Sequence, residues 1–276
     1  MFNDKVIWIT GASSGIGRAL AIELASLGAS IILSSRSESE LYQVKEQCSD
    51  NICEGQKHLV LSYDATDEQK VEQLVKQAKN FKGKIDFLIN NAGISQRAKV
   101  MDTDISTYRM LFEIDVFAPI ILTKAVLPIM LRQKSGHIVV TSSVAGKVGV
   151  PFRTGYCAAK HAVMGFFDSL RSEVAQYGIN VSTITPGYIQ TNISKNAVKG
   201  DGSSFGKLDA SIEGGMNVTQ CANVIIKGLA KNKPEIPVGV GLEMKILWLK
   251  RLVPNLVFKI MNGQYKKMAE SNQING

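Results

Sequence analysis

Side chains that bind metals or cross-link small proteins are scarce in this sequence. Its 276 residues include four cysteines and three histidines, and none of them has the C-x-x-C or ligand spacing of a zinc site. We therefore expect no metal site, and we expect small buried or half-exposed thiols in a reducing cytosol rather than disulfides. The cysteines are Cys48, Cys53, Cys157 and Cys221.

Long uninterrupted apolar runs are also absent from the N-terminus, which reads MFNDKVIWIT and carries an acid at Asp4. Nothing there has the length of a signal peptide or of a membrane-spanning helix. Hydrophobic residues make up 45% of the chain and charged residues 20%, which excludes a disordered or low-complexity protein. We expect a soluble, cytoplasmic protein that is long enough to bury its own core.

Acidic residues are fewer than basic residues mainly near the C-terminus. The formal net charge is +8, and residues 227–276 hold nine Lys or Arg against three Glu, so this stretch supplies most of the excess. The rest of the chain is nearly balanced and has no basic stripe interleaved with aromatic residues. We therefore do not expect nucleic acid as a partner.

Residues 242–276 form a basic, apolar C-terminal extension. Its centre, Lys245–Met261, reads KILWLKRLVPNLVFKIM, and Pro254 interrupts any helix there. No uncharged run approaches the roughly 18–20 residues that a membrane span needs. Three roles stay open: packing on the body or at a subunit contact, weak attachment to an anionic membrane surface, and a roof over a substrate pocket.

Short runs rich in Val and Ile alternate with longer amphipathic segments up to this extension. Continuously apolar strands are typical of a parallel sheet buried on both faces, and strict β-α alternation predicts a doubly wound fold. We predict one α/β domain over residues 1–276, a Rossmann-type doubly wound parallel sheet flanked by helices. The expected strands are Lys5–Thr10, Ser30–Ser34, His58–Ser62, Ile85–Ile89, His137–Ser142, Asn180–Ile184 and Glu235–Val238. The expected helices lie near 15–27, 38–49, 67–81, 104–132, 155–177 and 218–231.

A glycine-rich turn, TGASSGIG, joins the first expected strand to the first expected helix. Gly11, Gly15 and Gly17 would let the backbone approach a pyrophosphate, and the helix N-terminus would supply free N–H groups. The spacing differs from G-x-G-x-x-G, so a simple tight turn between strand and helix stays an alternative.

The end of the next expected strand favours a phosphorylated cofactor. Where an acid would bind the 2′-hydroxyl of NAD, the sequence has Ser35, Arg36 and Ser37. Arg36 can pair with a 2′-phosphate and Ser13 in the glycine turn can add a hydroxyl, whereas a carboxylate would repel that phosphate. We predict NADP(H) rather than NAD(H); the alternative for Arg36 is a solvated surface residue.

Tyr156 and Lys160 are the principal catalytic candidates. Four residues apart on an expected helix, they share one face, and a nearby ammonium stabilises a phenolate, so the pair suits proton transfer near neutral pH. Ser143 follows an expected strand, at the sheet edge that borders the ligand crevice. Its hydroxyl can polarise a carbonyl oxygen while Tyr156 delivers the proton. Two further motifs follow strands in the same way, Asn90-Asn91-Ala92-Gly93 and Pro186-Gly187.

Together these motifs resemble the short-chain dehydrogenase/reductase family. The turn TGASSGIG, the NNAG, the Ser143, Tyr156 and Lys160 set and the PGYIQT segment stand in the family's order within residues 5–191. The later stretch, from TNISKNAVKGDGSSFGKLD to LVPNLVFKIM, resembles more narrowly the dehydrogenase/reductase member-seven, steroid-dehydrogenase-like branch. The resemblance implies hydride transfer between a nicotinamide and a carbonyl or alcohol carbon.

The resemblance also implies a role for each matching residue. Tyr156 is expected as the general acid/base, Lys160 as the residue that assists it and binds ribose, and Ser143 as the holder of the substrate oxygen. The expected contacts to phosphates and ribose come from Gly11, Ser13, Ser14, Gly15, Ile16 and Gly17. Arg36 is expected to contact the 2′-phosphate and Asp64 the adenine, while Asn91, Ala92 and Gly93 line the path from adenosine to ribose. The nicotinamide is expected to contact Pro186, Gly187, Ile189 and Thr191.

Asp115, in FEIDVFAP, departs from the family pattern, which usually has Asn there. That Asn helps to hold a water in a proton relay to the Lys, largely through its backbone carbonyl. Asp keeps the carbonyl and adds a carboxylate, which is either partly neutral or paired with Lys160. We expect activity to survive with a shifted pH optimum, so Asp115 joins the expected catalytic set.

The glycine-rich residues 188–216 are expected to form a lid over the nicotinamide. Apolar side chains in and near it favour a lipophilic alcohol or ketone over a sugar or an acid, with plain packing as the alternative; they are Val148, Val150, Phe152, Ile193, Val198, Phe205 and Met216. We expect a homodimer or homotetramer, since the helices near 104–132 and 155–177 are apolar and commonly pair in the family. The rival function is a non-catalytic, NADP-sensing binding protein on the same fold.

Overall fold

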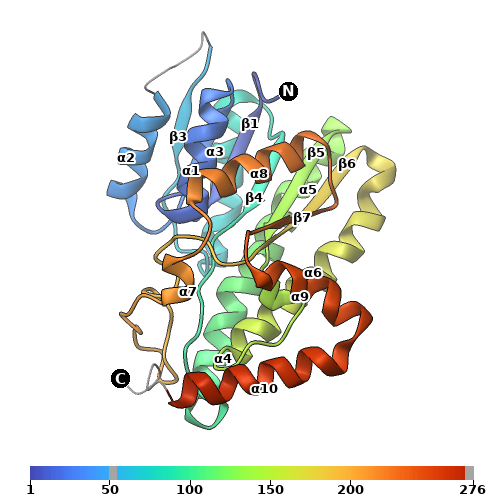
Figure 1. Cartoon of the computed structure of the whole chain (residues 1–276). Helices are drawn as coiled ribbons and strands as arrows, with labels where there is room; N and C mark the ends of the chain where they lie inside the picture. The colour runs from blue at the N-terminus through green and yellow to red at the C-terminus, as the bar shows by residue number, and fades with distance from the viewer. Residues whose placement is uncertain (50–54, 271–276) are drawn as a thin grey trace.

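A computed structural model of the chain describes residues 1–49 and 55–270. Its centre is a parallel sheet of seven strands in the order β3-β2-β1-β4-β5-β6-β7 (Figure 1). The chain winds outward from the middle twice, once from β1 to β3 and once from β4 to β7, so the predicted doubly wound fold is confirmed. The strands are β1 Val6–Thr10, β2 Ser30–Ser34, β3 His58–Val60, β4 Phe87–Asn90, β5 Gly136–Thr141, β6 Ile179–Pro186 and β7 Glu235–Val238.

Helices cover both faces of the sheet, because successive strand residues point to opposite sides and most of them are apolar. The covering helices are α1 Gly15–Ser26, α2 Glu38–Ser49, α3 Glu68–Lys82, α5 Ala118–Gln133, α6 Thr154–Val174 and α8 Val218–Ala230. In β1, Ile7 and Ile9 belong to the core beneath α1, α2 and α8. Val6 and Trp8 belong to the core beneath α3, α5 and α6. The result is three layers, with the sheet buried in the middle.

The helix expected near 104–132 is divided by a wider turn. It consists of α4 Ile105–Phe112, a π-helical turn at Glu113–Phe117, and α5. π-Helical turns are rare and occur frequently at functional sites. Here the turn carries Asp115, which is only 1% exposed. The apolar periodicity of the sequence predicted one continuous helix because the residues on both sides of the turn face the same core.

One helical run in the described part of the chain is long and apolar enough to cross a membrane by length and composition alone. It spans Ile105–Gln133, 29 residues that contain an 18-residue stretch with a mean hydropathy of 1.9. In this structure Leu122, Val126 and Met130 of α5 are buried in the core next to the sheet, and Leu111 is buried in α4, which packs on α6. Core helices of soluble proteins have the same composition, so this test by itself does not assign a membrane span.

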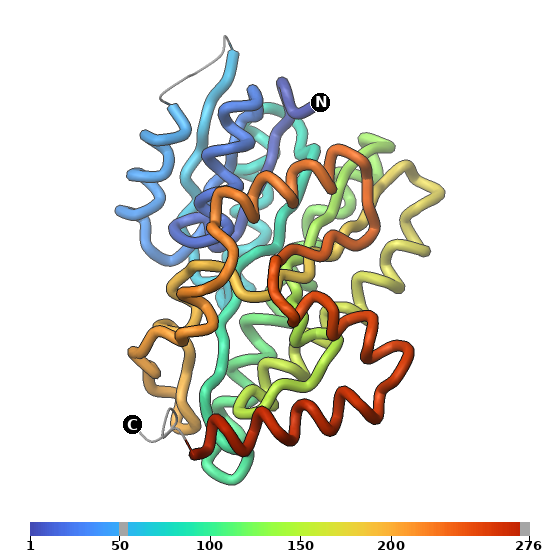
Figure 2. Tube along the Cα trace, viewed as in Figure 1, coloured from blue at the N-terminus to red at the C-terminus, as the bar shows by residue number. Residues whose placement is uncertain are grey.

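The C-terminal extension forms two helices, α9 Leu242–Leu252 and α10 Pro254–Glu270. Pro254 separates them, as predicted, and it is the first residue of α10, where a missing N–H is tolerated. Figure 2 shows this red segment turning back beyond β7 toward the region of residues 188–216. Tyr265 of α10 stacks on Phe152, with ring centroids 5.1 Å apart, so α10 packs on the body. Cys53 and residues 271–276 lie outside the described residues.

Candidate active site

The glycine turn between β1 and α1 has a backbone that only glycine accommodates easily. Gly11 and Gly15 have φ angles of +64° and +53°, in the left-handed region that disfavours residues with a Cβ. A Cβ on Gly17 would overlap the carbonyl oxygen of Gly11. The turn therefore leaves the start of α1 open for a phosphate group, beside the half-exposed Ser13 and the exposed Ser14.

Asn91 joins three strand ends next to this turn. The backbone N–H groups of Asn91 and Ala92 donate to Thr10 Oγ1 at 3.0 and 3.1 Å. The Asn91 side chain donates to Thr10 O at 3.2 Å and accepts from Thr141 Oγ1 at 3.2 Å. These bonds connect β1, β4 and β5 where the winding of the sheet reverses, which is where open α/β sheets bind ligands.

Arg36 and Asp64 lie at the far end of the same sheet edge, after β2 and β3, and both are exposed. The backbone N–H of Thr66, together with the Arg36 guanidinium, holds the pKa of the Asp64 carboxyl below its usual range. Arg36 therefore lies within electrostatic reach of the residue expected at the adenine. No carboxylate stands at Ser35–Ser37, where an acid would bind the 2′-hydroxyl of NAD.

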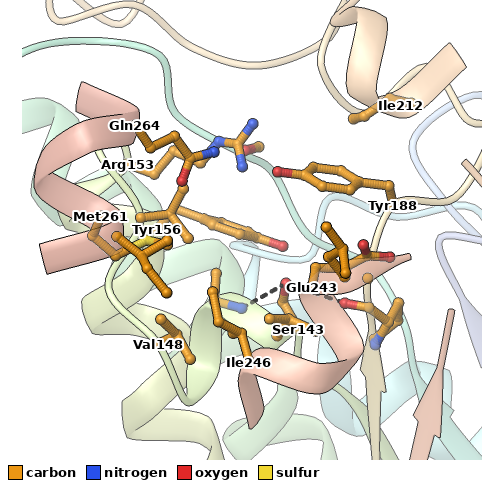
Figure 3. Close-up of a pocket in the computed structure, with 18 of the residues that line it drawn as sticks. Ser143, Val148, Arg153, Tyr156, Tyr188, Ile212, Glu243, Ile246, Met261 and Gln264 are labelled. Atoms are coloured by element: carbon orange, nitrogen blue, oxygen red, sulfur yellow. Dashed lines mark hydrogen bonds between the residues drawn. The ribbon is translucent and has the colours of Figure 1, made fainter. Parts of the chain in front are cut away.

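Ser143 and Tyr156 face the same cavity beyond the carboxyl ends of β5 and β6. Figure 3 shows the Tyr156 ring projecting into this space, with its hydroxyl end toward Ser143 and Tyr188. Ser143 Oγ accepts a hydrogen bond from Ala145 N at 3.1 Å and lies 3.5 Å from Pro186 O. The structure thus brings these two predicted residues together at one cavity.

Lys160 lies behind Tyr156 in a nearly closed space. Its Nζ is 5.7 Å from the centroid of the Tyr156 ring and donates to Thr141 O at 3.2 Å. Asp115 Oδ2 is 3.7 Å from the same Nζ, while Asp115 Oδ1 accepts from Ile94 N at 2.8 Å. A Cβ on Gly93 would lie 2.8 Å from Asp115 Oδ1, so the NNAG backbone covers this pair.

Asp115 is a fully buried carboxyl group. Complete burial raises the pKa of its carboxyl, and the Lys160 ammonium and the Ile94 N–H oppose that effect without cancelling it. Within the described residues, its Oδ2 has no hydrogen-bond partner. The carboxyl that stands in place of the family's usual Asn thus lies against Lys160, and burial favours its protonated form.

The segment after β6 reaches from the cavity back to the glycine turn. Gly187 N donates to Val238 O at 2.8 Å, which anchors the segment to β7. Ile189 is buried and lies opposite Met216 in a parallel bridge, in which Met216 N donates to Tyr188 O and Gln190 N donates to Met216 O, each at 2.9 Å. A Cβ on Gly15 would lie 3.2 Å from Thr191 Cγ2. The predicted nicotinamide and phosphate residues thus lie next to each other.

The cavity that Ser143 and Tyr156 line has a volume of about 450 Å³. The predicted apolar residues Val148, Val150 and Ile193 line it, and Ile212 adds a further apolar contact from residues 188–216. Phe152, Val198, Phe205 and Met216, which were also expected there, are not among its lining residues.

Several lining residues were not predicted individually from the sequence. Ile246 of α9 and Met261 and Gln264 of α10 close the cavity (Figure 3), so the extension provides the roof that was one of its three open roles. Arg97 and Arg153 also line it. Arg153, three residues before Tyr156 in an apolar stretch, was the one detectable hint, whereas the partner of both arginines, Asp209, lies far away in sequence.

Comparisons with known proteins agree with this fold. The family model for "short chain dehydrogenase" matches residues 5–202, which include β1 to β6, Ser143, Tyr156 and Lys160. The chain belongs to the short-chain dehydrogenase/reductase family of oxidoreductases, whose members act on alcohol and carbonyl groups with a nicotinamide dinucleotide.

Individual relatives and solved structures are similar to most of this chain. "Dehydrogenase/reductase SDR family member 7B" of Xenopus laevis is 37% identical over 270 residues, which cover 96% of this chain and 83% of that protein. A short-chain dehydrogenase/reductase from Burkholderia phymatum in complex with NAD has the same fold, with a TM-score of 0.81 and 24% identity over 92% of this chain and 95% of that one. A metagenomic short-chain oxidoreductase in complex with NADP is 30% identical, with a TM-score of 0.63 over 67% of this chain and 83% of that one.

Replacing Asp115 with Asn tests the effect of the carboxylate. When Asp115 ionises, its charge lies 3.7 Å from Lys160 Nζ and offsets the positive charge behind Tyr156. Asn cannot ionise, so we expect kcat for alcohol oxidation by Asp115→Asn to reach its plateau at a pH lower by about one unit. The exposed Asp102→Asn is the control, and superimposable pH profiles for Asp115→Asn and the parent would contradict the expectation.

Proposed function

We propose that the protein is an NADP(H)-dependent oxidoreductase that interconverts an alcohol and a ketone or aldehyde on a lipophilic substrate. The observation that carries this proposal is the position of Tyr156. Its ring projects into a largely apolar cavity, with Ser143 beside its hydroxyl end and Lys160 Nζ 5.7 Å from the ring centroid. A proton-transfer group, an oxygen-binding hydroxyl and a buried cation therefore meet at the carboxyl ends of the strands.

In this proposal Ser143 donates a hydrogen bond to the substrate oxygen and Tyr156 exchanges the proton of that oxygen. In reduction Tyr156 gives the proton to the forming alkoxide, and in oxidation it removes the proton from the alcohol. Lys160, which is 4% exposed, favours the phenolate by its charge. Asp115 moderates that charge.

The cofactor proposal rests on the fit of the groove. The glycine turn forms a cradle that a Cβ on Gly17 would fill, and Arg36 is exposed at the end of β2. The residues that would hold NADP(H) are those of the turn from Gly11 to Gly17, together with Arg36, Asp64, the NNAG segment, Lys160 and the Pro186–Thr191 segment. When bound there, NADP(H) supplies or accepts the hydride.

The domain and assembly proposals have separate support. Within residues 1–49 and 55–270, one sheet contains all seven strands, which supports a single domain. Ile193 and Ile212 line the cavity, which supports residues 188–216 as a lid. Exposed apolar side chains on the α4–α5 run, Ile105, Met110 and Phe117, support a homodimer or homotetramer formed through these helices.

We also propose that the protein is cytoplasmic and touches a membrane surface through the exposed side chains of α9 and α10. Trp248 and Leu252 of α9 are 72% and 76% exposed, and Phe258 of α10 is 51% exposed. Lys245 and Lys250 lie among them in the sequence. Aromatic and basic side chains together suit the interface of an anionic membrane.

Tyr156→Phe tests the proposed catalysis. We expect kcat for NADPH-dependent reduction of hydrophobic ketones to fall at least about a hundredfold, because the proton donor is lost. NADPH binding, followed by fluorescence titration, is expected to persist. The half-exposed Tyr177→Phe is the control. A parent protein that binds NADPH but reduces no ketone or aldehyde in a broad panel would favour the rival binding-protein function.

Arg36→Glu tests the cofactor preference. The reversed charge would repel a 2′-phosphate, so we expect the KM for NADPH to rise at least about tenfold while the KM for NADH changes little. The matched control is Lys57→Glu, the same change of charge at an exposed position before the start of β3. Equal effects on both cofactors would rule out a contact between Arg36 and the phosphate.

Tryptophan fluorescence tests the membrane contact. The chain has two tryptophans, of which Trp8 is fully buried and Trp248 is exposed. We expect a blue shift of tryptophan emission on adding phosphatidylserine vesicles, its loss in Trp248→Phe, and its reversal by about 0.5 M salt. Phosphatidylcholine vesicles are the control. Unchanged emission with the anionic vesicles would exclude the contact.

A further inference from the structure

Two arginines lie inside the cavity that Tyr156 lines. Arg97 follows the NNAG segment and Arg153 immediately precedes α6, and both line the cavity with Ser143 and Tyr156. Their side chains are only 5% and 10% exposed. Burial, with repulsion from Arg153, lowers the pKa of Arg97 to about 10, so Arg97 is still a cation at neutral pH. Buried cations in an apolar cavity require a compensating charge.

One carboxylate serves both arginines. Asp209 Oδ2 lies 2.9 Å from Arg97 Nη2 and 2.9 Å from Arg153 Nη2, so the cluster keeps one positive charge in excess. Arg97 also donates to Gln96 O at 2.9 Å and to Ser95 Oγ at 3.3 Å. Arg153 is less well satisfied, because its buried Nε has no hydrogen-bond partner within residues 1–49 and 55–270.

The other charged groups around the cavity do not neutralise this cluster. Glu243, at the start of α9, accepts a hydrogen bond from Gly241 N at 3.2 Å and lies beside Gly187. Among the ion pairs of the described residues, none joins Glu243 to either arginine. Lys259 and Lys267 of α10 also line the cavity and are exposed. They add positive charge at the entrance, which attracts anions.

A purely structural role explains only half of the cluster. Asp209 precedes α7 Ala210–Glu213 and accepts from Ser211 N at 3.0 Å, so an ion pair here ties residues 188–216 to the body. One guanidinium is enough to neutralise one carboxylate. The second guanidinium lines the cavity, and its charge is not neutralised by Asp209, so it remains available to an anionic group there.

We propose that Arg97 and Arg153 bind a carboxylate or phosphate group of the substrate, which makes the substrate an amphipathic oxo-acid or the phosphate ester of an oxo-alcohol. The planar guanidinium fork matches the paired oxygens of such groups. The apolar part of the substrate lies against Val148, Ile246 and Met261. This inference rests on the proposed oxidoreductase function of the same site. It adds an acidic group to the lipophilic substrate, which the apolar residues alone gave no reason to expect.

Initial rates with three ketones of equal alkyl chain test this substrate class. They are a free keto acid, its methyl ester, and the phosphate monoester of the matching keto-alcohol. We expect the parent to favour one of the anions over the ester by at least about tenfold in kcat/KM, mainly through KM. The favoured anion identifies the acidic group. A parent that handles the ester as well as both anions would overturn the proposal.

Substitutions at Arg153 connect that preference to the cluster. Arg153→Gln is expected to reduce the ratio of anion to ester kcat/KM at least about fivefold, and Arg153→Lys is expected to restore part of it. Arg132→Gln, the same change at an exposed position of α5, is expected to keep the parent ratio. An unchanged ratio in Arg153→Gln would contradict the role of this residue. If that variant does not fold, judged by thermal unfolding, Arg153→Lys and the parent decide.

A binding measurement separates this inference from the proposed function. Calorimetric titration of the NADPH-loaded protein with decanoate, decyl phosphate and decanol needs no turnover. We expect one anion to bind at least about tenfold more tightly than decanol. Anion-selective binding without any ketone reduction would contradict the oxidoreductase proposal and support the anion site. Reduction of neutral ketones without anion-selective binding would do the reverse.

Discussion

The hydrogen bonds of Asn91 join the three strand ends on which the whole site is built. Thr10 at the end of β1 and Thr141 at the end of β5 are tied to this one residue after β4. Because the chain winds in opposite directions from β1 and β4, the sheet opens a crevice at this point. The glycine turn lies on one side of it and Ser143 on the other. Without these hydrogen bonds, the residues proposed to bind the cofactor and those proposed to bind the substrate would no longer be held at fixed positions relative to each other.

Buried charge organises both ends of the cavity. Behind Tyr156, Lys160 faces the fully buried carboxyl of Asp115, whose pKa is raised by burial, and at the cavity wall two guanidiniums share Asp209. In each place the groups lie out of water, where electrostatic interactions are stronger than at the surface. The two clusters differ in composition, since the first sets one carboxyl against one cation and the second sets two cations against one carboxylate. That difference matches the roles proposed for them, proton transfer at one end and anion binding at the other.

The C-terminal extension serves the cavity on one side and faces solvent on the other. Ile246 and Met261 close the space above Tyr156, while Trp248 and Leu252 remain exposed. The two helices carry apolar side chains on more than one side, so they have no single polar face. The hydrophobic pattern of Lys245–Met261 therefore did not distinguish a roof over the cavity from a membrane contact or a subunit contact. The packing of Tyr265 on Phe152 shows that the roof is a part of the fold.

The sequence by itself determined the doubly wound fold class, the helix–strand alternation and the residues at the strand ends, because buried parallel strands need unbroken apolar runs and tight turns need particular glycines. It predicted that Ser143, Tyr156 and Lys160 belong to one site, because the serine follows a strand and the other two share one helix face. Tertiary structure alone decided the π-helical turn that buries Asp115, the roof of α9 and α10, and the joining of Arg97 and Arg153 through Asp209. These features depend on contacts between segments that are far apart in the chain, and local periodicity carries no information about which distant side chain will neutralise a buried charge.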